Sequence, residues 1–250
     1  MSTAFASPAG GRVLRIARRE FSTFFNSPVG YVVLGVFLAV SGFLFFFVGP
    51  LFLRGDANMR PFFGLMPVIF MFFAPAITMR LIAEERKSGT IENLLTLPVR
   101  EWEVVVGKYA AAMGMVAVAL AFTLPYPLSL SAITAPGASM DRGPVIAGYV
   151  STLLLSSSFL AVGMWASALG KDQILGFIVG LAMCFALWIP DQISIFFPES
   201  FGSFLQFLSA NHHFESIARG VIDTRDVLYY VTVTAVGLIG TTRMLASVRH

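Results

Sequence analysis

Six apolar stretches, each close to the length that crosses a membrane, constrain the fold of this chain more than any other feature. An α-helix needs about 20 apolar residues to span the hydrocarbon core. Only 12% of the 250 residues are charged, roughly half the share in soluble domains. We therefore predict an all-α integral membrane protein with six transmembrane helices. Residues 1–28 form an N-terminal segment, and the transmembrane domain covers 29–250, with spans near residues 29–53, 62–79, 104–135, 144–169, 173–197 and 227–246.

Prolines and glycines modify individual spans. Pro125 and Pro127 are expected to kink or end the third span, and the proline pair in 62–79 to act likewise on the second, because proline removes a helix hydrogen bond. Gly176 and Gly180 lie four residues apart on the fifth span. This spacing permits close helix approach, either within one chain or between two chains.

The distribution of Lys and Arg predicts the orientation. With the N-terminus inside, 12 of the 17 basic residues lie at inner span ends, as the positive-inside rule requires. Both termini and the charged segment 84–98 are therefore predicted to be cytoplasmic. The basic residues are scattered over span ends rather than gathered in one patch, so nucleic acid is not an expected partner.

The segment ahead of the first span has two faces. Leu14, Ala17, Phe21 and Phe24 recur at helical spacing, and the arginines fall largely on another face. We predict an amphipathic helix in the inner membrane interface, with its arginines among the phosphates of membrane lipids. An ordinary positively charged anchor explains the same pattern. The interfacial residues singled out are Arg12, Arg15, Arg19, Phe21 and Phe24.

The densest charged segment, residues 84–98, separates the second and third spans. Glu84 to Lys87 can extend the second span, Ser88-Gly89 ends it, and Thr90 to Leu97 can form a second short helix before Pro98. Ile91, Leu94 and Leu95 share one face of that helix and form a small apolar ridge, which suits a groove on a partner protein. A solvated loop is the alternative. The candidate docking residues are Glu84, Glu85, Arg86, Gly89, Thr90, Ile91, Glu92, Leu94 and Leu95.

Residues 198–226, before the last span, are polar but show apolar residues at helical spacing. We predict two short helices that re-enter the outer leaflet and return, because backbone at that depth must be helical or buried in protein. The alternative is a pair of helices lying flat on the surface. Gly220 is expected at a turn, where lack of space or a positive φ requires glycine. The residues singled out are Phe204, Leu208, Phe214 and Gly220.

No catalytic, cofactor-binding or metal-binding residue is expected in this chain. His212 and His213 are adjacent, so one helix aims them about 100° apart, and a cap or interface role is favoured over a metal site. The phosphate-binding loop has glycine, four residues, then Gly-Lys-Ser/Thr, and neither Gly107-Lys108 nor Gly170-Lys171 satisfies it. Charge deep in the spans is nearly absent, which disfavours an ion-coupled carrier.

Residues 80–98 resemble the signature of type 2 ABC exporter permeases, most closely the gliding-motility-associated subgroup. The resemblance extends to residues 18–21, 25–31 and 213–230. It implies six spans per subunit, a dimer with an identical or paralogous permease, and a location in the bacterial inner (plasma) membrane. It also implies that the 80–98 segment holds a cytoplasmic coupling helix, at Thr90–Leu97, seated in a separate ATPase subunit, which holds ATP and Mg.

Two functions fit these expectations. The first is a permease that couples ATP hydrolysis by the partner to export of an unidentified substrate. The second is a non-transporting membrane subunit that transmits ATPase force to an extracytoplasmic protein or supports a membrane machine. In both, the chain itself is not an enzyme.

Overall fold

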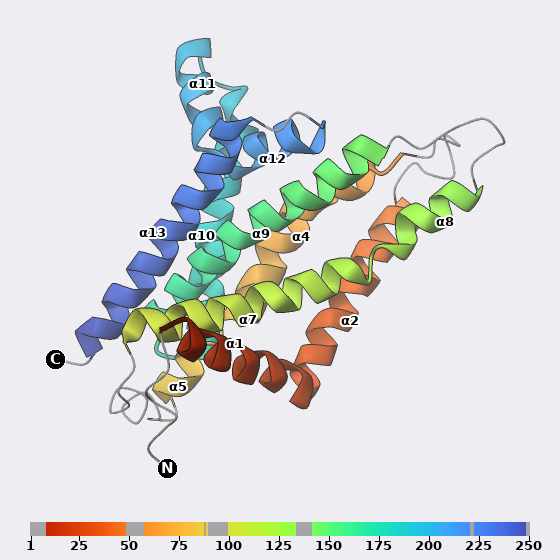
Figure 1. The fold of residues 1–250 in the computed structure, drawn as a ribbon. Coiled ribbons are helices and arrows are strands. Elements are labelled where there is room, and N and C mark those ends of the chain that lie inside the picture. Colours follow the sequence, from red (N-terminus) through yellow and green to blue (C-terminus); the bar gives the residue numbers. More distant parts are fainter. Residues whose placement is uncertain are drawn as a thin grey trace.

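The computed structural model of the chain describes residues 9–48, 58–87, 89, 100–133, 142–220 and 223–248. Helices make up all the regular structure of these described ranges (Figure 1). They are α1 (Ala9–Asn26), α2 (Pro28–Phe43) with a π-helical turn η1 (Leu44–Val48), α4 (Arg60–Thr78), α5 (Ala83–Lys87), α7 (Glu101–Ala121), α8 (Pro125–Ile133), α9 (Arg142–Leu169), α10 (Gln173–Ser194), α11 (Glu199–Leu208), α12 (Ala210–Ala218) and α13 (Thr224–Val248).

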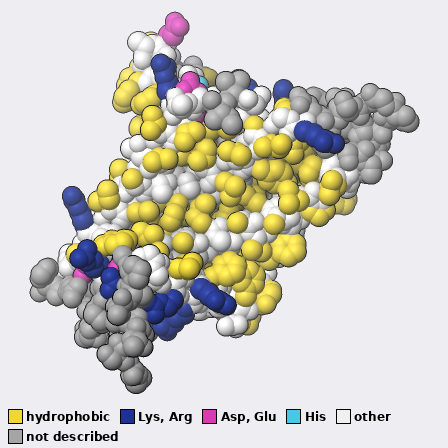
Figure 2. Space-filling view, viewed as in Figure 1, with side chains coloured by type: hydrophobic (Ala, Val, Ile, Leu, Met, Phe, Trp, Pro, Cys, Tyr) yellow, Lys and Arg dark blue, Asp and Glu magenta, His cyan; other side chains and the backbone are white. Residues whose placement is uncertain are grey.

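Six helical segments of the described chain are long and apolar enough to cross a membrane, which confirms the predicted all-α, six-span fold. Hydrophobic side chains cover the middle of the face shown in Figure 2, and most Lys and Arg side chains lie toward its ends. This distribution matches an apolar membrane layer between two polar surfaces. The segments are Pro28–Phe47, Arg60–Arg86, Glu101–Leu130, Arg142–Leu169, Gln173–Ser194 and Thr224–Ser247.

Helix α4 forms the centre of the bundle. It packs against α2, α9 and α10, and α12 contacts it as well. The second span does not end at Pro67 or Pro75, since α4 continues through both prolines to Thr78. Both prolines are buried, so neighbouring helices hold the segment helical although each proline lacks an N–H.

The third span is interrupted where its prolines predicted a break. Helix α7 ends at Ala121, a turn follows, and α8 begins at Pro125. Proline is favoured at the first position of a helix because its missing N–H would have no partner there. Tyr126 then packs its ring edge-on against Phe62, with centroids 5.6 Å apart. The proline thus redirects the chain, and the tyrosine fixes the new direction.

The Gly176 and Gly180 face of α10 is used inside this chain. A Cβ atom on Gly180 would lie 3.2 Å from the Pro75 side chain of α4 and 3.5 Å from the Ala166 side chain of α9. A Cβ on Gly176 would lie 3.3 Å from the Ser167 backbone of α9. The two glycines therefore allow α4, α9 and α10 to pack closely together.

Helices α11 and α12 lie at the end of the bundle opposite α1, α5 and the last turn of α13 (Figure 1). Helix α11 returns alongside α10, because Gly202 packs near the Ser194 carbonyl and the Ser209 hydroxyl donates to the Trp188 carbonyl at 3.2 Å. Trp188 is about 9 Å inside the end of α10. The Ser151 hydroxyl of α9 likewise donates to the Phe214 carbonyl of α12 at 2.9 Å. Helix α12 thus lies among the ends of α4, α9, α10 and α13, and α11 lies beside α10.

Candidate functional site

The end of the bundle that carries α1 and α5 brings together most of the described charged side chains that sequence reasoning singled out. Helix α1 crosses this end beside α7 (Figure 1). Two glycines of α7 make room for it, because a Cβ on Gly107 would lie 2.6 Å from the Ile16 side chain and one on Gly114 would lie 3.0 Å from the Phe21 ring. Helix α1 is therefore fixed to protein along one face.

A first ion pair fixes the beginning of α1 to the beginning of α7. The Arg12 Nη2 atom lies 2.8 Å from Glu103 Oε1, and the Glu103 side chain is fully buried. The Arg100 backbone N–H donates to the other Glu103 oxygen at 3.0 Å, so the carboxylate also caps α7. A buried carboxylate needs such partners, because burial of an unpaired charge is costly.

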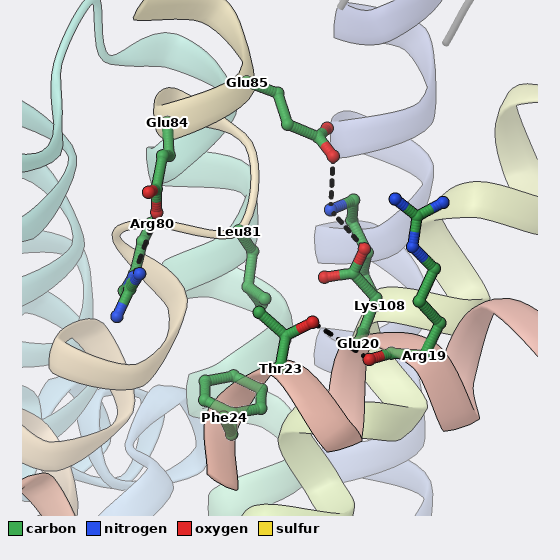
Figure 3. A pocket seen from close by; sticks show the side chains of 9 residues that line it. All are labelled: Arg19, Glu20, Thr23, Phe24, Arg80, Leu81, Glu84, Glu85 and Lys108. Carbon is green, nitrogen blue, oxygen red and sulfur yellow. Dashed lines mark hydrogen bonds and ion pairs between the residues drawn. The ribbon is translucent and has the colours of Figure 1, made fainter. Parts of the chain in front are cut away.

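Lys108 of α7 forms the second and most central ion pair. Its Nζ atom lies 2.8 Å from Glu85 Oε1 on α5 and 3.1 Å from Glu20 Oε1 on α1 (Figure 3). Only 4% of the Lys108 side chain is exposed. One ammonium thus connects three elements, and removing it would leave two carboxylates facing each other in a poorly hydrated place.

The turn between α4 and α5 is fixed to the end of α9. The Ser167 hydroxyl accepts hydrogen bonds from the Ile82 and Ala83 N–H groups at 3.3 and 3.1 Å, and it lies 2.9 Å from the Met79 carbonyl. Arg86 donates to the Ala168 carbonyl at 2.9 Å. Gly89 follows α5 with φ of 67°, a conformation that glycine adopts at little cost. The base of the 84–98 segment is therefore held by α7 and α9 together.

The docking residues predicted from sequence divide into two groups. Glu84, Glu85 and Arg86 lie on α5, where Glu84 pairs with Arg80 at 3.0 Å. Thr90, Ile91, Glu92, Leu94 and Leu95, which carry the predicted coupling helix, lie outside the described residues. The structure thus describes the base of the segment, and the coupling helix itself remains a prediction.

The interfacial residues of α1 also have different surroundings. Arg12 is paired with Glu103, and Phe21 packs on Gly114, as described above. Arg15 and Arg19 are exposed. Leu14, counted with the apolar face in the sequence, is 70% exposed, because the face that packs on α7 is offset toward Ile16. Helix α1 thus has one protein-facing side and one side open to its surroundings.

A cavity of about 290 Å³ lies between α1, the α4–α5 turn and α7 (Figure 3). Charged groups surround most of it, and Leu81 and Phe24 supply apolar contacts. In Figure 3 the Arg80–Glu84 pair stands on one side and Lys108 with Glu20 on the other. The residues that line it are Arg19, Glu20, Thr23, Phe24, Arg80, Leu81, Glu84, Glu85 and Lys108.

At the opposite end, polar contacts hold the α11–α12 pair against α13. His213 is buried, with Nδ1 2.7 Å from Asp226 Oδ1 and Nε2 2.9 Å from the Phe207 carbonyl. The Tyr230 hydroxyl donates to the Ala210 carbonyl at 2.8 Å. His213 therefore joins α11, α12 and α13, which is the interface role favoured over a metal site. No cluster of three metal-ligating side chains occurs among the described residues.

The residues singled out in the α11–α12 region differ in exposure. Phe214 is buried at 1% exposure, whereas Phe204 and Leu208 are 58% and 47% exposed. Gly220 has φ of 96°, and no atom lies within 4 Å of a Cβ built on it. Of the two reasons expected for glycine there, positive φ is correct and lack of space is wrong.

Sequence reasoning missed the charged contacts that organise the α1 end. In the sequence, Lys108 is one of the basic residues near inner span ends, and no pattern distinguishes Glu20 or Glu103. The available signal was the position of Lys108 inside an apolar span, since a charge at such a position requires a partner. The sequence does not identify that partner, because Glu20 and Glu85 lie in other segments.

Comparison with known protein families identifies a match over most of the chain. The model of a family described as ABC-2 family transporter protein matches residues 18–241, which is most of the chain. No curated protein matches the sequence. The match begins within α1 and ends within α13, so it covers the first five membrane-crossing segments, most of the sixth and the α11–α12 pair.

Proposed function

Because the chain belongs to the ABC-2 family of transporter proteins, we propose that it couples ATP hydrolysis by a separate ATPase subunit to export of a substrate across the membrane. Family membership and six apolar helices make the chain a multi-pass membrane permease, which is not a catalytic subunit. We propose three further properties: export of a substrate, an ATPase partner, and coupling between the two.

The observation that carries the proposal is that Lys108 contacts both Glu85 and Glu20. A permease driven from outside its membrane domain needs a rigid base under its docking segment, residues 84–98. Movement of that segment can then reach the membrane-crossing helices. Glu85 ties the start of the docking segment to α7, and Arg86 ties it to α9. Movement of this segment would therefore displace two membrane-crossing helices directly.

The sequence supports a separate ATPase. A phosphate-binding loop requires Gly-Lys followed by Ser or Thr, and the chain has Tyr109 and Asp172 at those positions. ATP and Mg²⁺ therefore belong to the partner. We propose that the α1 end faces the cytoplasm, where ATP is available, because most basic residues lie at inner span ends under the positive-inside rule, and that the membrane is a bacterial inner membrane. We further propose a second permease subunit, identical or paralogous, and retain the gliding-motility-associated subgroup as the expected branch of the family.

Co-purification tests the docking surface. The chain would be co-expressed with an ATP-binding-cassette ATPase encoded beside it, and the ATPase captured with the tagged permease would be measured. Ile91→Asp and Leu94→Asp should abolish capture, because a carboxylate on the apolar ridge would be buried without a partner. Leu14→Asp is the matched control, since Leu14 is exposed at the same end. Full capture by both ridge variants would contradict the proposal.

A further inference from the structure

The cavity beside Lys108 has a charge pattern that the proposed coupling does not use. Three cationic and three acidic side chains line it, so its formal charge is zero. Lys108 is occupied by Glu20 and Glu85, and Arg80 by Glu84. Within the described part of the chain, the Arg19 guanidinium has no ion pair. The exposed Arg19 side chain thus borders the same cavity, called the chamber below, as the exposed Glu84 carboxylate, which also pairs with Arg80.

The chamber lies next to apolar surface. A narrow crevice shares Phe24 and Arg80 with it and is otherwise lined by Val29, Gly30, Val33, Ala76, Ile77 and Met115. Helix α2, which supplies Val29, Gly30 and Val33 to the crevice, also carries Val32 and Val36, which are 61% and 56% exposed, as side chains facing lipid tails are. This arrangement suits a membrane lipid. Its headgroup would bind in the polar chamber at the span end, and its acyl chains would lie along the apolar border.

We propose that this chamber binds the headgroup of a zwitterionic aminophospholipid, with its phosphate on Arg19 and its primary ammonium on Glu84. Arginine is well suited to phosphate, and a carboxylate accepts the N–H bonds of an ammonium. A purely anionic lipid gains no net attraction from a neutral chamber, and a choline headgroup has no N–H to donate. The bound lipid would bridge α1 and α5 beside the Lys108 contact.

Native mass spectrometry of the purified full chain tests this assignment. Delipidated protein would be titrated with palmitoyl-oleoyl phosphatidylethanolamine, phosphatidylglycerol or phosphatidylcholine, and the fraction carrying one lipid would be measured. We expect phosphatidylethanolamine to be retained about tenfold more strongly than the other two, the scale of one charge-assisted hydrogen bond. No ATPase is present, so the result is independent of the proposed coupling.

Variants locate the site. Arg19→Gln should weaken phosphatidylethanolamine retention about tenfold, whereas Arg18→Gln, one residue away and outside the cavity lining, should leave it unchanged. Glu84→Gln gives the chamber a net positive charge, so it should shift the preference to phosphatidylglycerol. Arg19 and Glu84 are both exposed, so these variants should fold normally. Equal retention of the three lipids, equal effects of the two arginine variants, or an unchanged preference in Glu84→Gln would overturn the assignment.

Discussion

The Lys108 ammonium lies 2.8 Å from the Glu85 carboxylate, which joins the beginning of the charged segment to the third membrane-crossing segment. Glu20 of α1 contacts the same ammonium at 3.1 Å. Since α1, α5 and α7 share one buried cation, a displacement of any one of them acts on the other two. This relationship gives the α1 end of the permease its mechanical connection.

Lys108→Met should lower the free energy of unfolding by about 3 kcal/mol, because removing one member of a buried ion group leaves its partners uncompensated. The triple variant Lys108→Met, Glu20→Gln, Glu85→Gln should recover most of that loss. Thermal unfolding in detergent measures both. Glu84→Gln, which breaks an exposed pair, is the matched control and should cost less than about 1 kcal/mol. A triple variant no more stable than Lys108→Met would show that the ion group is not the cause.

Gly107→Ala should loosen α1 from α7. The new Cβ would lie 2.6 Å from the Ile16 side chain, and overpacking of this kind costs about 1–3 kcal/mol. Limited proteolysis within α1 reports the detachment, and Ile16→Ala in the same chain should reverse it by restoring space. Gly35→Ala is the control, because nothing lies within 4 Å of a Cβ there. If Gly35→Ala and Gly107→Ala were cleaved at the same rate, α1 would not depend on this contact.

Gly220→Ala and Gly220→Leu should destabilise the chain to a similar degree, by about 1 kcal/mol. The cost comes from φ of 96° and not from crowding, since the space around Gly220 is open. Side-chain size should therefore have little effect, which thermal unfolding of the two variants compares directly. A much larger loss for leucine than for alanine would mean that the site is crowded.

His213→Ala should destabilise the α11–α12 pair more than His212→Ala. The His213 ring contacts both Asp226 and the Phe207 carbonyl and is buried, whereas the His212 side chain is 48% exposed. Loss of one buried hydrogen bond to a charged group costs about 1.5–3 kcal/mol. Hydrogen exchange across 199–218 measures the local opening. Equal exchange in the two variants would exclude the bridging role of His213.

The membrane-crossing helices are predictable from sequence because lipid imposes a strong and local requirement: an apolar stretch of sufficient length with its backbone bonded internally. The break at Pro125 is also local, since proline itself lacks the N–H that would continue the helix. The continuous path of α4 through Pro67 and Pro75 is not predictable in this way. It depends on α2, α9 and α10 packing around the helix, which no pattern within 60–78 contains.

In the candidate site, too, local features are predictable from sequence and contacts between helices are not. The charge density of 84–87 and the amphipathic character of α1 are visible in the sequence. The partners Lys108–Glu20 and Arg12–Glu103 are not, because each joins residues from different helices and depends on how α1 crosses α7. The offset of the α1 packing face toward Ile16 has the same origin, since Gly107 and Gly114 determine where α1 fits.

Site-specific photocrosslinking tests the central claim most directly. A benzophenone amino acid would replace Leu94 in the docking segment, or Phe204, which is exposed at the opposite end of the bundle, in membranes that contain the ATPase. Position 94 should crosslink to the ATPase, and position 204 should not. A crosslink from position 204, or none from position 94 in a complex that still hydrolyses ATP and co-purifies, would contradict it.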